Sequence, residues 1–429
     1  MSTKLVEIAM KARKDRKAIF TSLAYIITPE FLKETWKMMN RKGAGGVDGE
    51  TIKEFEENLE ERIQDVWQRM KDKKYKAPPV RRVEIDKGNG KTRPLGIPTV
   101  EDRLVQRAVA RILDAIFEQD FMDFSYGFRP GRNPHQALKT LRSCIVTKKV
   151  RQVFEADIRG YFNNINHEWL MKMLRQRISD PMILGMVGKW LKAGVMINGV
   201  VTRNEEGVPQ GGPISPILAN IYLHYVLDLW FEKKFKKYAQ GEAYLVRFAD
   251  DYVACFQYKR DAEKFEKYSK YRMNKFGLEL AEEKTRMMPF GRYAWERVAN
   301  YSAKPGTFDF LGFRHICGIG QNGQFTLVRI PTVKSCRKFL KNVHEWLKGH
   351  SHWKRRDQQK QLTSMLNGFY QYFSLYHCGR KLRYIRAEIV KQWIRSLRRR
   401  SQRHKMYWSY LASKDWFKLP YPELIHADV

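Results

Sequence analysis

The sequence predicts an α+β fold in which antiparallel β-hairpins and helices share the first three quarters of the chain and a mostly helical segment follows. Residues 245–256, LVRFADDYVACF, hold two apolar runs around a short turn, and their Val, Phe, Tyr and Cys favour strands. Residues 80–98, VRRVEIDKGNGKTRPLGIP, alternate Val and Ile with charge around a Gly-Asn-Gly turn, which is typical of a hairpin. From Pro331 onward the strand signals vanish and the helical period dominates.

The other elements are justified in chain order. Residues 1–40 look helical and basic, and Thr28-Pro29 marks a helix start, because proline suits the first helical position. After a glycine-rich break at 41–49, we expect a helix to about residue 74, the hairpin at 80–98 and a helix at 101–117. A strand should end at Asp157, with Asn166 or a neighbour capping the next helix. Further along we expect an apolar helix late in 207–223, a helix at 261–276, a strand at 308–316 and a hairpin turn at 321–324.

Charge is the dominant compositional feature. Lys and Arg number 80 against 46 Asp and Glu in 429 residues, a formal net charge of +34. An excess of this size indicates a polyanionic partner, nucleic acid first and an anionic membrane surface second. No apolar run approaches the roughly 18–20 residues of a spanning helix, and the N-terminus lacks a signal-peptide pattern. We therefore expect a cytoplasmic protein with no membrane partner.

The five cysteines are scattered through the chain, with no CxxC pair and no HExxH motif. This pattern argues against a disulfide framework or a structural zinc site. We expect reduced cysteines that are mostly buried as small apolar groups.

Three aspartates form the strongest candidate site. Asp250 and Asp251 are adjacent at the tip of the predicted hairpin, where like charges repel. A divalent cation such as Mg²⁺ would compensate, since it prefers hard oxygen ligands; a polar turn is the alternative, because Asp is a common turn residue. Asp157 closes another strand, which matters only if it lies near the pair in space.

Basic and glycine-rich segments surround this candidate site in the sequence. The 80–98 hairpin carries Arg81, Arg82, Lys87, Lys91 and Arg93. These side chains are either solvated edge-strand charges or a clamp for a triphosphate or phosphodiester. Residues 125–132, SYGFRPGR, combine aromatics with arginines, which suits unpaired bases and backbone. The Gly/Pro-rich start of 207–223 fixes a backbone path close to something bulky, or is simply a stiff loop.

The last quarter of the chain has its own composition. Residues 331–429 hold 22 Lys and Arg against 6 Asp and Glu, interleaved with aromatics and ending one helix near Arg398, Arg399 and Arg400. A helical nucleic-acid-binding domain is the preferred interpretation, and a merely soluble basic bundle is the alternative. The composition places a domain boundary at about 325–335.

At this point the sequence resembles the reverse transcriptases encoded by bacterial and organellar group II introns. The resemblance runs from about residue 35 to about 420. Its blocks appear in the family's order: GVDG, KTRPLGIPTVEDRLVQRAV, SYGFRPGR, ADIRGYFNNINH, GVPQGGPISPILANIYL, RFADD, FGLELAEEKT, FLGF and LNGFYQYF. It implies a right-hand polymerase with an antiparallel palm sheet. Residues 1–75 would be a helical extension and the start of the fingers, 76–325 the fingers and palm, and 326–429 the thumb and maturase (X) domain.

The resemblance also implies roles for individual residues. Asp157, Asp250 and Asp251 match the catalytic carboxylates that hold two Mg²⁺ ions, with Mn²⁺ as a substitute. Deoxynucleotide contacts would come from Arg81, Lys87, Arg93, Phe162 and Gln210, with Tyr161 competing with Phe162 as the residue that closes against a ribose 2′-hydroxyl. Nucleic-acid contacts would come from Arg129, Arg132, Lys284, Arg398, Arg399 and Arg400.

The implied function is RNA-directed DNA synthesis together with maturase activity. The implied partners are an RNA template, a group II intron RNA, a DNA primer or target and deoxynucleoside triphosphates, for a monomer or homodimer in the bacterial cytosol. Two departures stand out: Phe248 replaces the family's usual Tyr, and no CxxC or HNH-type cluster follows the maturase segment. Alternatives are a splicing-only maturase, a domesticated relative in host defence or DNA repair, and a two-metal nuclease, which the basic hairpin and PQGG loop fit poorly.

Overall fold

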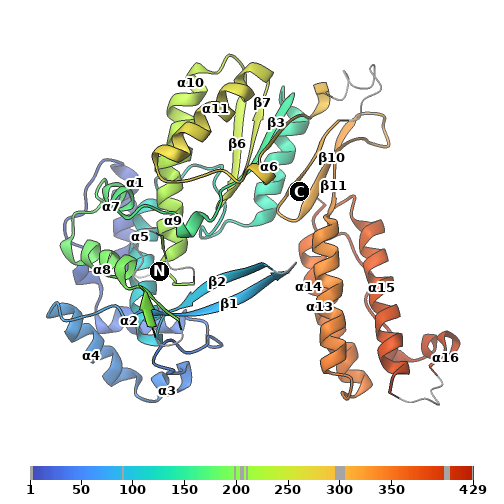
Figure 1. Cartoon of the computed structure of the whole chain (residues 1–429), viewed down its shortest axis with the longest axis horizontal. Coiled ribbons are helices and arrows are strands. Elements are labelled where there is room, and N and C mark those ends of the chain that lie inside the picture. Colours follow the sequence, from blue (N-terminus) through green and yellow to red (C-terminus); the bar gives the residue numbers. More distant parts are fainter. Residues whose placement is uncertain are drawn as a thin grey trace. The chain divides into compact units, whose positions relative to one another are not determined.

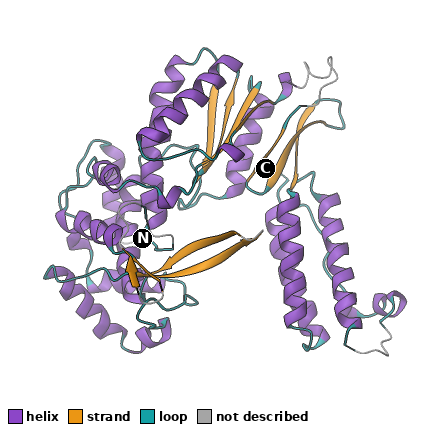
Figure 2. Ribbon diagram, viewed as in Figure 1, coloured by secondary structure: helices purple, strands orange, loops and turns teal. Residues whose placement is uncertain are grey.

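A computed structural model describes residues 3–88, 91–197, 200–202, 207–208, 211–294, 305–400, 406–427 and 429 (Figures 1 and 2). The chain forms two compact units. The first comprises residues 1–133, 154–254 and 260–286, and the second comprises 134–153, 255–259 and 287–429. This division differs from the three ranges expected from the sequence, because the second unit also includes segments from the middle of the chain.

The first unit contains many of the α-helices. They are α1 (Thr3–Lys14), α2 (Pro29–Lys37), α3 (Ile52–Glu57), α4 (Leu59–Lys71), α5 (Val100–Phe117), α7 (His167–Leu174), α8 (Pro181–Lys192), α9 (Ser215–Leu223), α10 (Lys236–Tyr238) and α11 (Lys259–Lys275). Thr28 caps α2 by accepting from the Phe31 N–H, with Pro29 in the first turn. Asn166 caps α7 by accepting from the Trp169 N–H. Both helix starts agree with the sequence-based expectation.

A four-stranded sheet with the order β2-β1-β4-β5 belongs to the first unit. Strands β1 (Val80–Gly88) and β2 (Lys91–Ile97) pair antiparallel, while β4 (Val195–Ile197) runs parallel to β1 and pairs antiparallel with β5 (Val200–Thr202). The predicted 80–98 hairpin is confirmed, although its turn lies outside the described residues.

The second four-stranded sheet has the order β6-β7-β3-β8. Its strands are β6 (Ala243–Phe248), β7 (Asp251–Phe256), β3 (Gln152–Asp157) and β8 (Arg286–Pro289). In Figure 1, α11 and the helical segment ending in α10 lie beside β6 and β7. Phe265 of α11 packs edge-on against Phe154 of β3, with ring centroids 5.4 Å apart. An apolar layer therefore joins helix and sheet and holds the strand ends in place.

The second unit contains α6 (Pro134–Thr147) and a three-stranded antiparallel sheet of the order β11-β10-β9, followed by long helices. The strands are β9 (Thr307–Phe310), β10 (Phe313–Ile319) and β11 (Phe325–Pro331); the helices are α13 (Val333–Gly349), α14 (Arg355–Phe373), α15 (Gly379–Arg398) and α16 (Trp408–Ala412). No strand follows Pro331 in the described part of the chain.

One element expected from the sequence is wrong. The single strand expected at 308–316 is split into β9 and β10, which pair with each other. The chain reverses at Leu311 and Gly312, whose φ angles are +50° and +78°. Glycine adopts this conformation freely, so the reversal depends on a signal that apolar periodicity does not carry.

Two further expectations can be compared with the structure. All five cysteines are free and buried, as expected. Among the described residues, no helix is both long and apolar enough to span a bilayer.

Candidate active site

The three candidate carboxylates are positioned by neighbouring strands of one sheet. Asp157 ends β3, Asp251 begins β7, and Asp250 lies in the turn before it. The Arg151 N–H donates to the Phe256 carbonyl over 2.9 Å, so the start of β3 lies beside the end of β7. The two strands are adjacent in the sheet, and the end of β3 therefore lies beside the start of β7. Asp157 therefore lies near the Asp250-Asp251 pair in space.

A buried ion pair supports the turn that carries Asp250. The Arg247 guanidinium bonds Asp228 through Nε at 2.8 Å and Nη2 at 2.5 Å, and neither side chain has exposed surface. Nη1 of Arg247 donates to the Ala249 carbonyl at 2.9 Å and to Oδ1 of Asn220 at 3.2 Å. Ala249 has φ +57°, a conformation that costs a non-glycine residue free energy. Arg247 thus helps to hold a strained turn.

The loop at 125–132 packs directly on this turn. The Tyr126 N–H donates to the Arg247 carbonyl at 2.9 Å, and Asn220 Nδ2 donates to the Gly127 carbonyl at 2.7 Å. A Cβ on Gly127 would lie 2.3 Å from the Ala249 nitrogen. Only glycine permits this approach without a shift of the backbone, so the loop and the carboxylate turn fix each other's position.

Basic side chains partly balance the charge at this edge of the sheet. Lys284 forms an ion pair with Asp157, and Arg286 pairs with Glu155 at 2.9 Å. Burial, followed by repulsion from Asp157 and Asp250, raises the pKa of Asp251 well above its ordinary value. Burial lowers the pKa of Lys284. The hydrogen bond to Asp157 and the attraction of the Asp157 charge outweigh burial, so the pKa of Lys284 is raised overall. Negative charge is therefore concentrated here.

The donor set suits a divalent metal. No group of three or more His, Cys, Asp or Glu side chains in the described residues is close enough to form a ready-made metal site. Mg²⁺ does not require one, because it is usually held by one or two carboxylates together with substrate phosphates and water. Burial, together with repulsion from Asp157 and Asp250, raises the pKa of Asp251, and a bound cation would relieve both unfavourable effects on the charged carboxylate. Asp157, Asp250 and Asp251 therefore fit such an ion.

Two neighbouring aromatics compete for one predicted role, and their surroundings differ. The Tyr161 hydroxyl donates to the Ala219 carbonyl at 2.5 Å, inside the protein. Phe162 is 8% exposed and meets Phe128 edge-on, with centroids 6.4 Å apart. Its carbonyl accepts from the Val208 N–H at 2.7 Å, which ties it to the start of the glycine-rich loop. Gln210 of that loop lies outside the described residues.

The predicted basic clamp is described only in part. Arg81 on β1 donates from Nη2 to the Gly45 carbonyl at 2.7 Å, while its buried Nε has no hydrogen-bond partner among the described residues. Lys87 and Arg93 occupy positions on β1 and β2, and their side chains lie outside the description. Gly211, with φ +122°, would bring a Cβ within 2.5 Å of the Gly96 carbonyl, so the glycine-rich loop packs on β2.

One predicted nucleic-acid contact is corrected by the structure. The Arg129 side chain is 3% exposed and pairs with Glu118 at 2.7 Å. It also donates to the Met122 and Ser125 carbonyls. Because these groups surround the guanidinium, Arg129 stabilises its own loop. Arg132 retains 28% side-chain exposure beside Asp123.

The arginines at the end of α15 border a basic cavity in the second unit. Arg398 donates to the Met406 carbonyl at 3.1 Å. Arg399 and Arg400 line a cavity of about 580 Å³ together with residues of α13 and α15. The other lining residues include His344, Lys348, His352 and Arg395. The lining therefore suits a phosphate-rich ligand.

Sequence reasoning missed the residues that hold the site together. Arg247 stands within the RFADD block, yet its partner Asp228 is 19 residues away on the helical segment after α9. Asn220 bridges this ion pair and the 125–132 loop. A charged residue within an apolar strand was the one available signal, because such a residue needs a buried partner.

Comparison with known proteins adds an independent finding. Residues 85–315, more than half of the chain, match the family described as reverse transcriptase (RNA-dependent DNA polymerase). Protein YkfC of Escherichia coli (strain K12) is 42% identical over 209 residues, covering 47% of this chain and 55% of that protein. Group II intron-encoded protein LtrA of Lactococcus lactis subsp. cremoris is 39% identical over 234 residues, covering 52% of this chain and 38% of LtrA.

A plant relative extends the comparison. Nuclear intron maturase 1, mitochondrial, of Arabidopsis thaliana is 32% identical over 95 residues, covering 22% of this chain and 13% of that protein. The chain thus spans about half or less of the length of these curated relatives. They nevertheless confirm the resemblance to group II intron proteins that the motifs indicated.

Proposed function

The chain belongs to the reverse transcriptase (RNA-dependent DNA polymerase) family, and from this premise we propose that it copies RNA into DNA at the edge of the β6-β7-β3-β8 sheet. The observation that carries the proposal is the location of Asp157, Asp250 and Asp251 at that one edge. The substrates are an RNA template, a DNA primer and deoxynucleoside triphosphates. The reaction is in-line attack of the primer 3′-hydroxyl on the α-phosphate, with pyrophosphate as the leaving group.

Reverse transcriptases use divalent metal ions, and here we propose two Mg²⁺ ions held by Asp157, Asp250 and Asp251. When bound, they supply charge neutralisation at the triphosphate and a lowered pKa at the primer hydroxyl. The protein keeps the carboxylates in place: Arg247 supports the Asp250 turn and Lys284 offsets charge on Asp157. Such preorganisation is the main catalytic contribution when the chemistry depends on positioning and electrostatics.

Nucleotide selection is assigned to the surroundings of Phe162 and to the β1–β2 hairpin. Phe162 is the proposed contact for the sugar, because the Tyr161 hydroxyl is bonded internally. Arg81, with an unpartnered Nε among the described residues, is the proposed triphosphate contact, together with Lys87, Arg93 and Gln210. Guanidinium groups match phosphate oxygens in both charge and geometry.

We assign to the second unit the binding of an intron RNA and assistance with its splicing. Support comes from the similarity to the group II intron-encoded protein LtrA and to the plant intron maturase, and from the cavity lined by Arg399 and Arg400. The 22 Lys and Arg among residues 331–429 supply the charge that such binding needs.

Primer extension tests the polymerase proposal. Asp250→Asn removes one carboxylate charge at nearly constant volume and should abolish extension on RNA and DNA templates in Mg²⁺, while primer–template affinity stays within about twofold. The matched control is Asp123→Asn, whose side chain is 99% exposed and which should extend like the wild type. Retained extension by Asp250→Asn would remove the carboxylate edge as the site of catalysis.

A further inference from the structure

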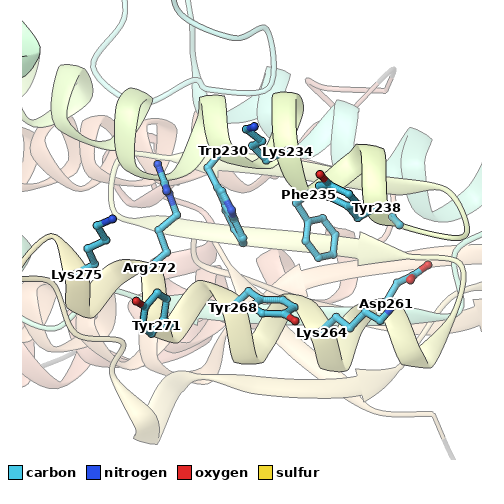
Figure 3. A pocket seen from close by; sticks show the side chains of 11 residues that line it. Trp230, Lys234, Phe235, Tyr238, Asp261, Lys264, Tyr268, Tyr271, Arg272 and Lys275 are labelled. Carbon is cyan, nitrogen blue, oxygen red and sulfur yellow. The ribbon is translucent and has the colours of Figure 1, made fainter.

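A groove on the first unit lies outside the candidate active site. It has a volume of about 490 Å³ and runs between the segment leading into α10 and helix α11 (Figure 3). We call it the aromatic groove. Its lining residues are Trp230, Lys234, Phe235, Tyr238, Ala239, Asp261, Lys264, Tyr268, Tyr271, Arg272 and Lys275. None of the three carboxylate residues of the candidate active site is among them.

The inner wall of the aromatic groove is part of the core. Trp230 stacks on Phe265 of α11 with centroids 5.7 Å apart, and Phe235 meets the same ring edge-on at 5.1 Å. The segment that carries them contains two π-helical turns, η3 (His224–Asp228) and η4 (Phe231–Phe235). π-Helical turns are rare in proteins, and those that do occur are often found at functional sites.

The outer wall presents aromatic rings to solvent. Tyr238, Tyr268 and Tyr271 are 76%, 52% and 72% exposed. None of the three has an aromatic or hydrogen-bond partner within the described residues. Tyr268 and Tyr271 are three residues apart on α11, so they lie on the same side of the helix, about one turn apart. Their faces are free to stack.

The charge around these rings is positive and not neutralised. Lys234, Lys264 and Lys275 line the aromatic groove and form no ion pair within the part of the chain that the structure describes. Two lysines of the same helical segments that do not line it are paired, Lys236 with Glu232 and Lys270 with Glu266, whereas Lys233, Lys237 and Lys267 neither line it nor pair within the described residues.

The one acid in the lining is Asp261, and one of its two carboxylate oxygens, Oδ1, is buried without a hydrogen-bond partner among the described residues. Asp261 is 1% exposed, and its Oδ2 accepts from the Gln240 and Gly241 N–H groups at 3.0 Å. Arg272 likewise donates to the Val226 and Tyr225 carbonyls. The ammonium groups of the three lysines are thus the charges left for a ligand.

We propose that the aromatic groove binds an unpaired nucleic-acid strand at a second site, separate from the carboxylate edge. Bases stack on Tyr268 and Tyr271, and Lys234, Lys264 and Lys275 contact the phosphates. Stacking on aromatic side chains combined with a positive groove is the usual basis of single-strand binding. Exposed tyrosine faces flanked by lysines favour this ligand over an acidic peptide, which would satisfy the charges but leave several rings without stacking partners. The proposal does not depend on catalysis at the carboxylates.

The test uses the full chain with its polymerase site occupied. The protein is first saturated with an unlabelled primer–template duplex. Fluorescein-labelled (rU)₁₂ or (dT)₁₂ is then titrated while anisotropy is recorded, and 4-thiouridine versions are crosslinked and mapped by mass spectrometry. Crosslinks should fall in residues 230–239 and 261–275. Tyr268→Ala/Tyr271→Ala should weaken oligonucleotide binding at least fivefold, since each stacked base contributes about 1–3 kcal/mol.

Matched variants separate the aromatic groove from general basicity. Lys264→Gln/Lys275→Gln should weaken binding and flatten its dependence on salt, because each lost phosphate contact lowers the slope by about 0.7. Lys267→Gln and Tyr258→Ala are controls, since both residues are exposed and neither lines the groove; they should bind like the wild type. Primer extension should remain normal in the tyrosine variant, so this test and that of the polymerase fail separately.

Each outcome of these experiments has one interpretation. Stronger binding of (rU)₁₂ than of (dT)₁₂ identifies the ligand as RNA, and the reverse identifies it as DNA. Crosslinks that map only elsewhere, or unchanged affinity in both double variants, would overturn the proposal. A poly-Glu/Tyr peptide should displace neither oligonucleotide. If the peptide binds the aromatic groove and the oligonucleotides do not, the ligand is a protein partner and the proposal of a nucleic-acid strand is wrong.

Discussion

Arg247 and Asp228 form an ion pair with no exposed surface, and the same guanidinium holds the Ala249 carbonyl of the turn before Asp250. Transfer of both charges out of water is costly, so such a pair stabilises little compared with an apolar pair of similar volume. The ion pair serves instead to hold the turn before Asp250 in place. The pair connects the segment after α9 to the carboxylate turn, and Asn220 extends that connection to the 125–132 loop.

Removal of Arg247 alone should therefore be severe. Arg247→Leu leaves Asp228 buried without a counter-charge and should reduce the free energy of unfolding by roughly 3–5 kcal/mol, measured by urea denaturation. Arg247→Leu/Asp228→Leu should recover most of that stability and yet extend primers poorly, because the Ala249 carbonyl loses its donor. Normal extension by the double variant would show that the turn needs no such support.

A smaller change tests the contact between the 125–132 loop and the carboxylate turn. Gly127→Ala places a methyl group 2.3 Å from the Ala249 nitrogen, so the backbone must shift. A displacement of about 1 Å at a catalytic group can lower the rate roughly 100-fold, and we expect at least a tenfold loss in primer extension. Gly188→Ala is the control: its added Cβ meets no atom within 4 Å in the interior of α8, and it should stabilise the fold by about 0.5–1 kcal/mol.

These two contacts show where sequence reasoning ends. The hairpin that carries Asp250 and Asp251 was predictable, because strand propensity and a short turn are local properties. The partnership of Arg247 with Asp228 was not, since it depends on how a helix packs on the sheet. The burial of Arg129 was missed for the same reason: a Gly/Pro/Arg loop predicts exposure, whereas Glu118 draws the guanidinium inward.

The division of the chain follows the same logic. Composition places a boundary near residue 330, where basic helices begin, but β11 pairs with β10 and both belong to the second unit, which continues from residue 287. Hydrogen bonding between strands fixes this unit, and composition does not record it. The sequence likewise did not show which lysines of the aromatic groove lack an ion pair, because the folded surface decides that, among the described residues, Lys270 is paired and Lys264 is not.

The identity of the residue that excludes ribonucleotides can be decided with two substitutions. Phe162→Ala removes the ring proposed to meet the sugar, and incorporation of ribonucleotides relative to deoxynucleotides should rise at least tenfold in single-nucleotide extension assays. Tyr161→Phe removes only the bond to the Ala219 carbonyl. It should reduce stability by about 1 kcal/mol and leave sugar selectivity unchanged. The opposite pattern would transfer the role to Tyr161.

Stability should fall as pH rises, because several buried carboxyl groups have raised pKa values. Burial raises the pKa of Asp114 on α5 from 3.8 to about 7, with Glu118 adding to it and Arg107 opposing it. Since the folded state holds this proton more tightly than the unfolded state does, the group's contribution is complete below about pH 4. It is lost progressively as the pH approaches 7.

Asp114→Asn removes this proton linkage at nearly constant volume. Between pH 5 and pH 8 the free energy of unfolding of the variant, relative to that of the wild type, should rise by roughly 2–4 kcal/mol. Asp102, whose pKa burial raises to about 6, remains in both proteins, so a weaker decline with pH should persist in the variant. Asp123→Asn, at a 99% exposed side chain, is the control and should follow the wild type throughout. If the difference in free energy of unfolding between Asp114→Asn and the wild type stays constant from pH 5 to 8, Asp114 has the same pKa in the folded and unfolded states. Burial of Asp114 on α5 would then not be the source of the pH dependence.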